Sequence, residues 1–589
     1  MKSFLKMTLA VVVGLILTGI LMFVIMLSVI SGITAASTKP AVIPEKSVLV
    51  LKTGTAIPDR TESNPLSGFS PLSLTITQAP GLNDILENLR KAASDDKISG
   101  ILIDNGVMPS GWATADELRL ALKEFKQSGK FIYSYSDYVL TQESYFISTA
   151  ADAIWLNPTS MFDFKGLAAE ITFYKDALDK LGVEVQVIRH GKFKGAVEPF
   201  ILDKLSDENR FQISEYMGSI WEYAVLAISD SRNISVVRVM DLADSLSGYN
   251  APLMISAGMI DGTIYRDQLD DSIRSAAGID AGKKINYVSM TKYAKAPVKR
   301  TGSLSKSKIA VVYAEGTIVM GEGDETNIGG NRYATELREV RLDTTIKAVV
   351  FRVNSPGGNV MASDMIWHEV DLTSKVKPVV VSMGNYAASG GYYISAAANK
   401  ILASPVTVTG SIGVFGLIPN AQTLLSKKLG ISSDVVRTNA HSDSPSITRP
   451  LSAYEKETIQ ANVERTYDTF LGVVAAGRGM TRGAVDSIGQ GHVWSGADAT
   501  GIGLVDSFGG LNAAIKEAAS LAGLENYRLI ERPVAVDFYT RLFNQMTGEM
   551  RTKILYRELG ESARYYNDLK EIISSKGVQA VMPWYIDIY

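Results

Sequence analysis

Ser389 is the residue of this chain whose type and surroundings are best suited to nucleophilic chemistry. It lies in Met383-Gly-Asn-Tyr-Ala-Ala-Ser389-Gly-Gly-Tyr-Tyr, between a strand expected over Pro378–Ser382 and a helix expected over Tyr392–Ala398. The free N–H groups and the dipole at a helix N-terminus favour developing negative charge on a serine hydroxyl. A serine that only caps the helix would occupy the same place. Ser389 can act as a nucleophile only if a base lies close enough to take its proton.

The sequence offers few candidates for the base that would activate this serine. The chain has four histidines, and their sequence surroundings show no evident acidic partner: His190, His368, His441 and His492. A lysine can serve instead if burial lowers its pKa from about 10.4 far enough to leave the amine neutral. Lys194 fits best because small and apolar residues, Gly-Ala-Val, follow it directly. Lys192 would point to the same side of an extended strand and is the second candidate. Spacing alone leaves both open as solvated surface lysines.

A tight glycine turn could supply the donors that acyl transfer needs. Asn354-Ser-Pro-Gly-Gly358 follows a strand expected over Ala348–Val353. Glycine permits positive φ and lets backbone N–H groups face a ligand, so Gly357 or Gly358 could stabilise an oxyanion. An ordinary turn can have the same sequence, and this motif does not decide alone.

The elements that position these residues belong to two halves that repeat at an offset of about 248 residues. Ile98–Asp104 is similar to Ile346–Arg352, and Tyr145–Ile154 is similar to Tyr392–Ile401. Gln142 occupies the place in the first half that Ser389 occupies in the second. Both halves alternate β-rich runs with helical stretches, which predicts parallel α/β layers. The expected strands include Val48–Leu51 and Ile309–Tyr313, and the expected helices include Thr114–Ser128 and Ser363–Thr373.

Length and composition restrict the class of protein. The chain has 589 residues, too many for one hydrophobic core, and its 59 Lys and Arg against 62 Asp and Glu give a net charge of −3. This balance gives no global attraction for nucleic acid. The chain has no cysteine, which excludes thiol nucleophiles, disulfides and thiolate metal sites, and its scattered histidines argue against a multi-histidine metal site.

The N-terminal region predicts a membrane anchor. No residue between Lys6 and Lys39 is charged, and Met7–Ile33 is nearly all apolar. A spanning helix needs about 20 apolar residues, whereas the apolar region of a cleavable signal peptide has only about 7–15. We expect a retained single-pass helix with a cytoplasmic N-terminus, and the remainder of the chain on the outer side. Thr34-Ala-Ala-Ser37 leaves a removed signal peptide as the alternative.

Together the motifs resemble the signal peptide peptidase A family, also called protease IV and peptidase family S49, in its long, duplicated, membrane-anchored bacterial form. The resemblance implies tandem ClpP/crotonase-like α/β domains, with Ser389 as nucleophile and Lys194 as general base. It also implies that Gly358 and Gly390 donate oxyanion N–H groups and that Ser411 hydrogen-bonds the lysine amine. Five motifs carry it, in the family's order: Lys194-Gly-Ala-Val-Glu-Pro-Phe200, Asn354-Ser-Pro-Gly-Gly358, Ala387-Ala-Ser-Gly-Gly-Tyr392, Thr409-Gly-Ser-Ile-Gly413 and Gly501-Ile-Gly-Leu-Val-Asp506.

The expected domain order follows from the repeat and the resemblance. An N-terminal anchor over residues 1–37 and a stalk over 38–46 precede a first ClpP/crotonase-like domain over 47–294, which supplies the lysine. A polar linker over 295–308 leads to a second such domain over 309–525, which supplies the serine. Residues 526–589 have no counterpart in the first half and form a C-terminal extension.

The activity implied by the resemblance is that of a membrane-anchored serine endopeptidase that degrades cleaved signal peptides and other hydrophobic peptides. It implies no metal or organic cofactor. It also implies a homotetramer at the bacterial inner membrane, with the catalytic domains on the periplasmic side. Two alternatives share the fold: an inactive membrane-anchored scaffold and a crotonase-type enzyme acting on acyl-CoA.

The sequence departs from the family pattern at two places. Gly195 stands where a serine is common after the lysine, and Asn385-Tyr386 replaces a more usual Gly-Met-like pair before the nucleophile. Neither change removes a catalytic atom. Both bear on the shape of the substrate pocket.

Overall fold

The computed structural model describes residues 40–62, 79–297, 305–324, 326–534 and 578–582, together with 69–70, 75–76, 587–588 and isolated residues between 6 and 21. Most of the anchor predicted over Met7–Ile33 and most of the C-terminal extension therefore lie outside the described residues. Within the described part, no helix combines the length and the apolar character needed to cross a bilayer.

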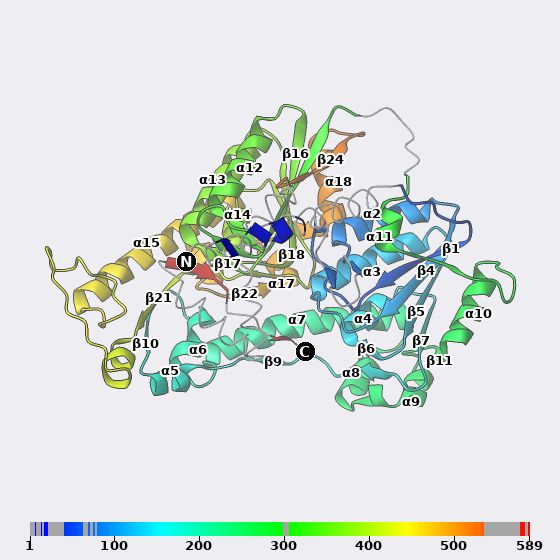
Figure 1. Cartoon of the computed structure of the whole chain (residues 1–589), viewed down its shortest axis with the longest axis horizontal. Helices are drawn as coiled ribbons and strands as arrows, with labels where there is room; N and C mark the ends of the chain where they lie inside the picture. The colour runs from blue at the N-terminus through cyan, green and yellow to red at the C-terminus, as the bar shows by residue number, and fades with distance from the viewer. Residues whose placement is uncertain are drawn as a thin grey trace.

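Two parallel sheets with the same strand order carry the two halves of the chain (Figure 1). The first consists of β1 (Ser47–Lys52), β4 (Ile98–Asn105), β5 (Phe131–Ser136), β7 (Ala153–Leu156), β11 (Gly262–Thr263) and β12 (Asn286–Ser289). The second contains β13 (Lys308–Glu315), β16 (Ile346–Ser355), β18 (Val379–Ala388), β19 (Lys400–Ala403), β23 (Ser507–Phe508) and β24 (Arg528–Arg532). The order β12-β1-β4-β5-β7-β11 repeats as β24-β13-β16-β18-β19-β23, and every neighbouring pair is parallel. The duplicated α/β fold predicted from the sequence is confirmed.

The helices repeat as the strands do. In the first half they are α2 (Leu82–Ala93), α3 (Trp112–Lys126), α4 (Gln142–Ser148) and α7 (Asp207–Arg232). Their counterparts in the second half are α12 (Gly330–Leu342), α13 (Val360–Ser374), α14 (Gly390–Ser395) and α15 (Ala453–Arg478). Gln142 begins α4, as expected from its alignment with Ser389, which directly precedes α14.

An equivalent ion pair is present at the end of the long helix in each half. The last residue of α7, Arg232, lies 2.9 Å from Asp261, and the last residue of α15, Arg478, lies 3.0 Å from Asp506. Each carboxylate also accepts a hydrogen bond from the backbone N–H of a strand residue, at 2.7 Å from Ile154 on β7 and at 2.8 Å from Ile401 on β19. The two halves therefore also share the interaction by which the C-terminal end of the long helix contacts the sheet through an aspartate.

A buried ion cluster joins the two halves to each other. Arg352 on β16 is fully buried and lies 2.7 Å from Asp59 and 2.7 Å from Glu117 on α3. Asp104 occupies the corresponding place in the first half. Because an unpaired buried charge is strongly unfavourable, the guanidinium and the two carboxylates hold the halves in one arrangement.

A third sheet crosses from the first half to the second and borders the candidate site. β10 (Glu184–Arg189) pairs antiparallel along its whole length with β21 (Phe415–Asn420). The sheet continues through β25 (Val578–Val581), β17 (Gly357–Asn359), β14 (Thr317–Val319) and β15 (Asn327–Gly329). In this way β10 carries the segment that follows it, including Lys194, across to the second half.

Candidate active site

Ser389 lies at a strained turn between β18 and α14. Its φ is 55° and its ψ is −114°, a conformation that residues with a side chain rarely adopt. Such strain costs about 1–3 kcal/mol and persists only where the surroundings impose it. Here the Ser389 N–H donates to the Gly410 carbonyl at 2.8 Å, and the residue is fully buried.

Ser411 reaches the same edge of the sheet by a simple topological route. β20 (Val408–Gly410) is the parallel neighbour of β18, with Ala388 opposite Gly410. The residues that follow two parallel neighbours emerge at the same edge, so Ser411 comes to lie beside Ser389. Because β18 continues to Ala388 to make this pairing, the strand is longer than the predicted Pro378–Ser382.

Lys194 brings its amine between the two serines. Its Nζ lies 2.8 Å from Ser389 Oγ, 3.0 Å from Ser411 Oγ and 3.1 Å from the Ser411 carbonyl oxygen. The lysine is fully buried. Lys192 is exposed instead, with its Nζ 5.0 Å from the centroid of the Phe193 ring. Of the two lysines that the sequence spacing could not distinguish, Lys194 is therefore the one that contacts Ser389.

The electrostatics of the lysine follow from its burial. Removal from water disfavours the ammonium form and lowers the pKa of Lys194 well below its usual 10.5. A neutral amine can accept the Ser389 proton while its own N–H groups point to the Ser411 oxygens. The arrangement is that of a base hydrogen-bonded to a nucleophile and oriented by a third group.

This lowered pKa predicts a pH dependence of stability. Between the folded-state pKa of Lys194 and about 10.4, the unfolded chain binds one more proton than the folded chain, so stability rises with pH. Relative to Lys194→Met, the wild-type free energy of unfolding should rise by up to about 1.4 kcal/mol per pH unit across this window. Urea unfolding at pH 7, 8 and 9 measures the difference. A pH-independent difference between the wild type and Lys194→Met would contradict the lowered pKa.

The glycine turn lies against the start of α14. A Cβ built on Gly357, whose φ is 105°, would fall 2.7 Å from the Gly390 nitrogen. A Cβ built on Gly390 would fall 3.0 Å from the Gly358 nitrogen. The N–H groups of Gly358 and Gly390 are therefore close together, directly beside Ser389.

In the described part of the chain, the imidazole rings of the four histidines make no hydrogen bond to Ser389, Lys194 or Ser411, although the His492 carbonyl accepts from the Ser411 N–H at 2.6 Å. The expectation that none has an acidic partner was wrong for two of them, because His190 lies 2.5 Å from Glu464 and His441 lies 3.2 Å from Glu455. Among the described residues, the hydroxyl of Ser389 has polar contacts to Lys194 and to the Gly413 carbonyl at 3.4 Å. The side chain that can take its proton is the lysine.

Three residues that support Lys194 were not found from the sequence. A Cβ on Gly413 would fall 3.3 Å from the lysine Cδ, and one on Gly491, with φ 85°, would fall 2.8 Å from the lysine Cβ. Glu198 is fully buried and accepts hydrogen bonds from Ser206 and Asn209, which fix the turn after the lysine. Gly413 and Glu198 lie inside quoted motifs, but the Gly491 contact joins distant segments and leaves no local sequence signal.

The two departures from the family pattern have structural explanations. A Cβ on Gly195 would fall 2.0 Å from the Asn209 amide nitrogen, so the amide occupies the space that a side chain after the lysine would need. Asn385 turns away toward the first half, where its Oδ1 accepts from the N–H groups of Ala113 and Thr114 at 3.0 and 3.1 Å. It therefore caps α3 and ties the halves together.

Comparison with known proteins identifies the family. The family model described as "Peptidase family S49" matches residues 124–280 and 371–525, and the one described as "Clp protease" matches residues 301–410. "Protease 4" of Salmonella typhi is 36% identical over 496 residues, which cover 81% of this chain and 78% of that protein. "Protease 4" of Haemophilus influenzae is 36% identical over 448 residues, covering 74% and 72%.

A plant relative extends the similarity. "Serine protease SPPA, chloroplastic" of Arabidopsis thaliana is 31% identical over 489 residues, covering 81% of this chain and 69% of that protein. The two segments matched by the S49 model fall in the two repeated halves of the fold. This chain belongs to peptidase family S49 and is a serine peptidase.

Proposed function

We propose that Ser389 is the nucleophile and Lys194 the general base of an endopeptidase that degrades cleaved signal peptides and other hydrophobic peptides. The observation that carries this proposal is the 2.8 Å contact between the lysine Nζ and the serine Oγ in a fully buried setting. This distance lies within the range for direct proton transfer. Because the amine is desolvated, it can accept a proton at neutral pH.

The reaction proceeds in two halves. Lys194 takes the Ser389 proton as Oγ attacks the peptide carbonyl, and the proton then passes to the departing amine, leaving an acyl-enzyme. Water, activated by the same lysine, releases the acyl group. The N–H groups of Gly358 and Gly390 hold the oxyanion, each contributing about 3–4 kcal/mol, and Ser411 orients the lysine.

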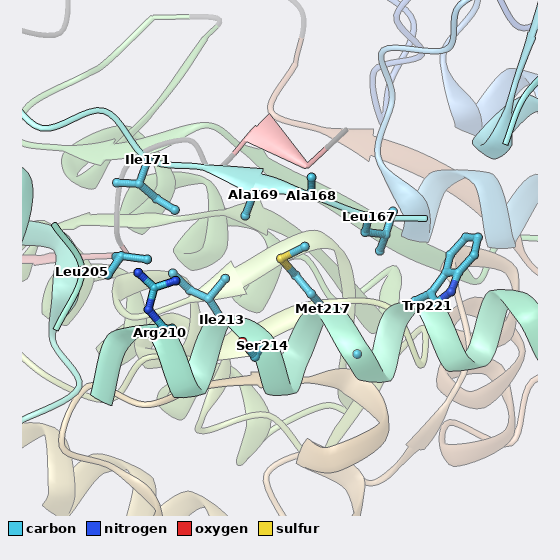
Figure 2. Close-up of a pocket in the computed structure, with 11 residues that line it drawn as sticks. Leu167, Ala168, Ala169, Ile171, Leu205, Arg210, Ile213, Ser214, Met217 and Trp221 are labelled. Atoms are coloured by element: carbon cyan, nitrogen blue, oxygen red, sulfur yellow. The ribbon is translucent and has the colours of Figure 1, made fainter. Parts of the chain in front are cut away.

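A cavity in the first half of the chain fits the proposal of hydrophobic substrates. This cavity of about 380 Å³ lies between α7 and residues 167–171, and most of the side chains that line it are apolar (Figure 2). A cavity of this kind suits apolar side chains with few polar fixing groups. Its lining includes Leu167, Ile171, Leu205, Ile213, Met217 and Trp221, with Arg210 and Ser214 among the polar members.

The remaining parts of the proposal concern location and assembly. The apolar run Met7–Ile33 supports a single-pass anchor at the bacterial inner membrane, with the two domains over 47–294 and 309–525 on the periplasmic side. The homotetramer rests on the family resemblance. Carbonate extraction of membranes and the mass of the detergent-solubilised protein test the two points separately.

The nucleophile is tested by covalent labelling. An acylating serine probe should label the wild-type chain, and peptide mapping should place the adduct on Ser389. Ser389→Ala should show no label and should not hydrolyse an apolar test peptide. An inactive scaffold would leave the wild type unlabelled and without activity, and a crotonase-type enzyme would instead turn over an acyl-CoA thioester.

A further inference from the structure

The C-terminal extension places a strand inside the candidate active site. β25 pairs antiparallel with β17 on one side, with Ala580 opposite Gly358, and antiparallel with β21 on the other, with Gln579 opposite Phe415. The Met582 N–H donates to the Pro356 carbonyl at 2.8 Å and continues the pairing. The segment thus fills the gap between two strands of the site in the extended form in which peptides add to a sheet.

The carbonyl oxygen of Ala580 lies beside the proposed oxyanion donors. The point where a Cβ on Gly357 would lie is 2.2 Å from the Ala580 oxygen and 2.7 Å from the Gly390 nitrogen. The corresponding point on Gly390 is 3.1 Å from the same oxygen and 3.0 Å from the Gly358 nitrogen. Of the described tail residues, Ala580 is the one whose carbonyl oxygen lies within about 3 Å of both points. A substrate carbonyl about to be attacked by Ser389 requires the same placement.

The side chains of this segment are buried in apolar surroundings, as those of a bound peptide substrate would be. Ala580, Val581 and Met582 expose only 1%, 7% and 5% of their surface. Ala580 packs in the core of the second half, and Val581 packs in a separate apolar cluster with Ala196, Val197 and Phe200, the residues just after Lys194. The small methyl group of Ala580 therefore occupies the position next to the reacting carbonyl.

A second attachment holds the chain beyond the reacting position. β26 (Asp587–Ile588) pairs antiparallel with β9 (Ala169–Glu170), and Ala169 also lines the apolar cavity of Figure 2. Four residues lie between Met582 and Asp587, so the Cα atoms of these two residues can be at most about 18 Å apart. The tail is thus held on both sides of Ala580, an arrangement that limits its movement during a reaction.

We propose that the Ala580–Val581 peptide bond is an autoproteolytic processing site, cleaved by the chain's own Ser389 and Lys194. Ser389 Oγ bonds to the Ala580 carbonyl carbon, the bond to the Val581 nitrogen breaks, and the proton from Ser389 passes through Lys194 to that nitrogen. Water then hydrolyses the Ala580 ester, which leaves a chain ending at Ala580 and a released peptide Val581–Tyr589. This inference rests on the proposed function of the same two residues.

Intact-mass measurement of the purified full-length chain tests the proposal. The wild type should lose the nine residues Val581–Tyr589, and Ser389→Ala should keep them. The same wild-type sample is assayed on an added apolar peptide. An uncleaved tail in a sample that hydrolyses the added peptide would overturn self-cleavage and leave the proposed function standing. An uncleaved tail without hydrolysis would overturn both, and a cleaved tail in Ser389→Ala would assign the cut to another protease.

Two tail variants test the register. Ala580→Glu places a carboxylate in a fully enclosed position and should slow loss of the nine residues by about 100-fold or more, because a buried unpaired charge is strongly unfavourable. Gln579→Glu introduces the same charge one residue earlier, at a half-buried position, and should leave the rate within about threefold. Equal rates for the two variants, or a cut at another bond, would overturn the assignment of Ala580–Val581.

Discussion

Lys194→Met should lower kcat for hydrolysis of an apolar peptide by about 10⁴-fold, with much less effect on KM. The methionine fills similar space but cannot take the Ser389 proton, and the serine hydroxyl alone is a weak nucleophile. The lysine amine is 2.8 Å from that hydroxyl, and burial has already lowered its pKa well below 10.5. Initial rates at saturating peptide measure the loss.

Two matched variants separate a base from a mere positive charge. Lys192→Met makes the same change two residues away on an exposed side chain and should keep activity within about twofold. Lys194→Arg keeps a cation that cannot lose its proton, so it should be as inactive as Lys194→Met. Activity retained in Lys194→Met, or lost equally in Lys192→Met, would move the base elsewhere.

Arg352→Met should lower the free energy of unfolding by about 3–5 kcal/mol. The guanidinium lies 2.7 Å from Asp59 and 2.7 Å from Glu117, and all three side chains are buried at the junction of the halves. Without it, two carboxylates remain enclosed with no cation. Burial already raises the pKa of Glu117, so protonation at low pH should relieve part of the defect.

The control for this prediction is an exposed ion pair. Arg90 lies 2.6 Å from Glu87 on the solvent side of α2, and Arg90→Met should change stability by no more than about 1 kcal/mol. Urea unfolding followed by circular dichroism compares the two variants. A deficit in Arg352→Met no larger than that of Arg90→Met would mean that the buried cluster does not hold the halves together.

Local patterns were enough to predict the parallel layers and the helices expected over Thr114–Ser128 and Ser363–Thr373, which correspond to α3 and α13. The apolar runs around Ile309–Tyr313 and Ala348–Val353 are central strands in the structure. They could be predicted because short apolar runs that alternate with helical segments are typical of buried parallel strands. The second half of β18 was missed, because Gly384 and Asn385 interrupt the apolar pattern while the backbone still pairs with β20. Pairing across a sheet depends on a partner that the local sequence does not contain.

The candidate site was predicted unevenly for the same reason. Ser389 and Lys194 stand in distinctive motifs, so each could be proposed from its own neighbours. The room that Gly491 makes for Lys194, and the pairing of His190 with Glu464, are contacts between segments hundreds of residues apart. The position of Ala580 beside Gly358 likewise follows from the third sheet and from no feature of the tail sequence.

The separation of Lys194 and Ser389 has a consequence for biosynthesis. The two residues are 195 positions apart, so at about 5–20 residues per second the ribosome completes the serine about 10–40 s after the lysine. A nascent chain, or one released by premature termination before Ser389, contains the proposed base without the proposed nucleophile. With these two residues as the catalytic pair, the chain becomes an active protease only after both halves have been synthesised.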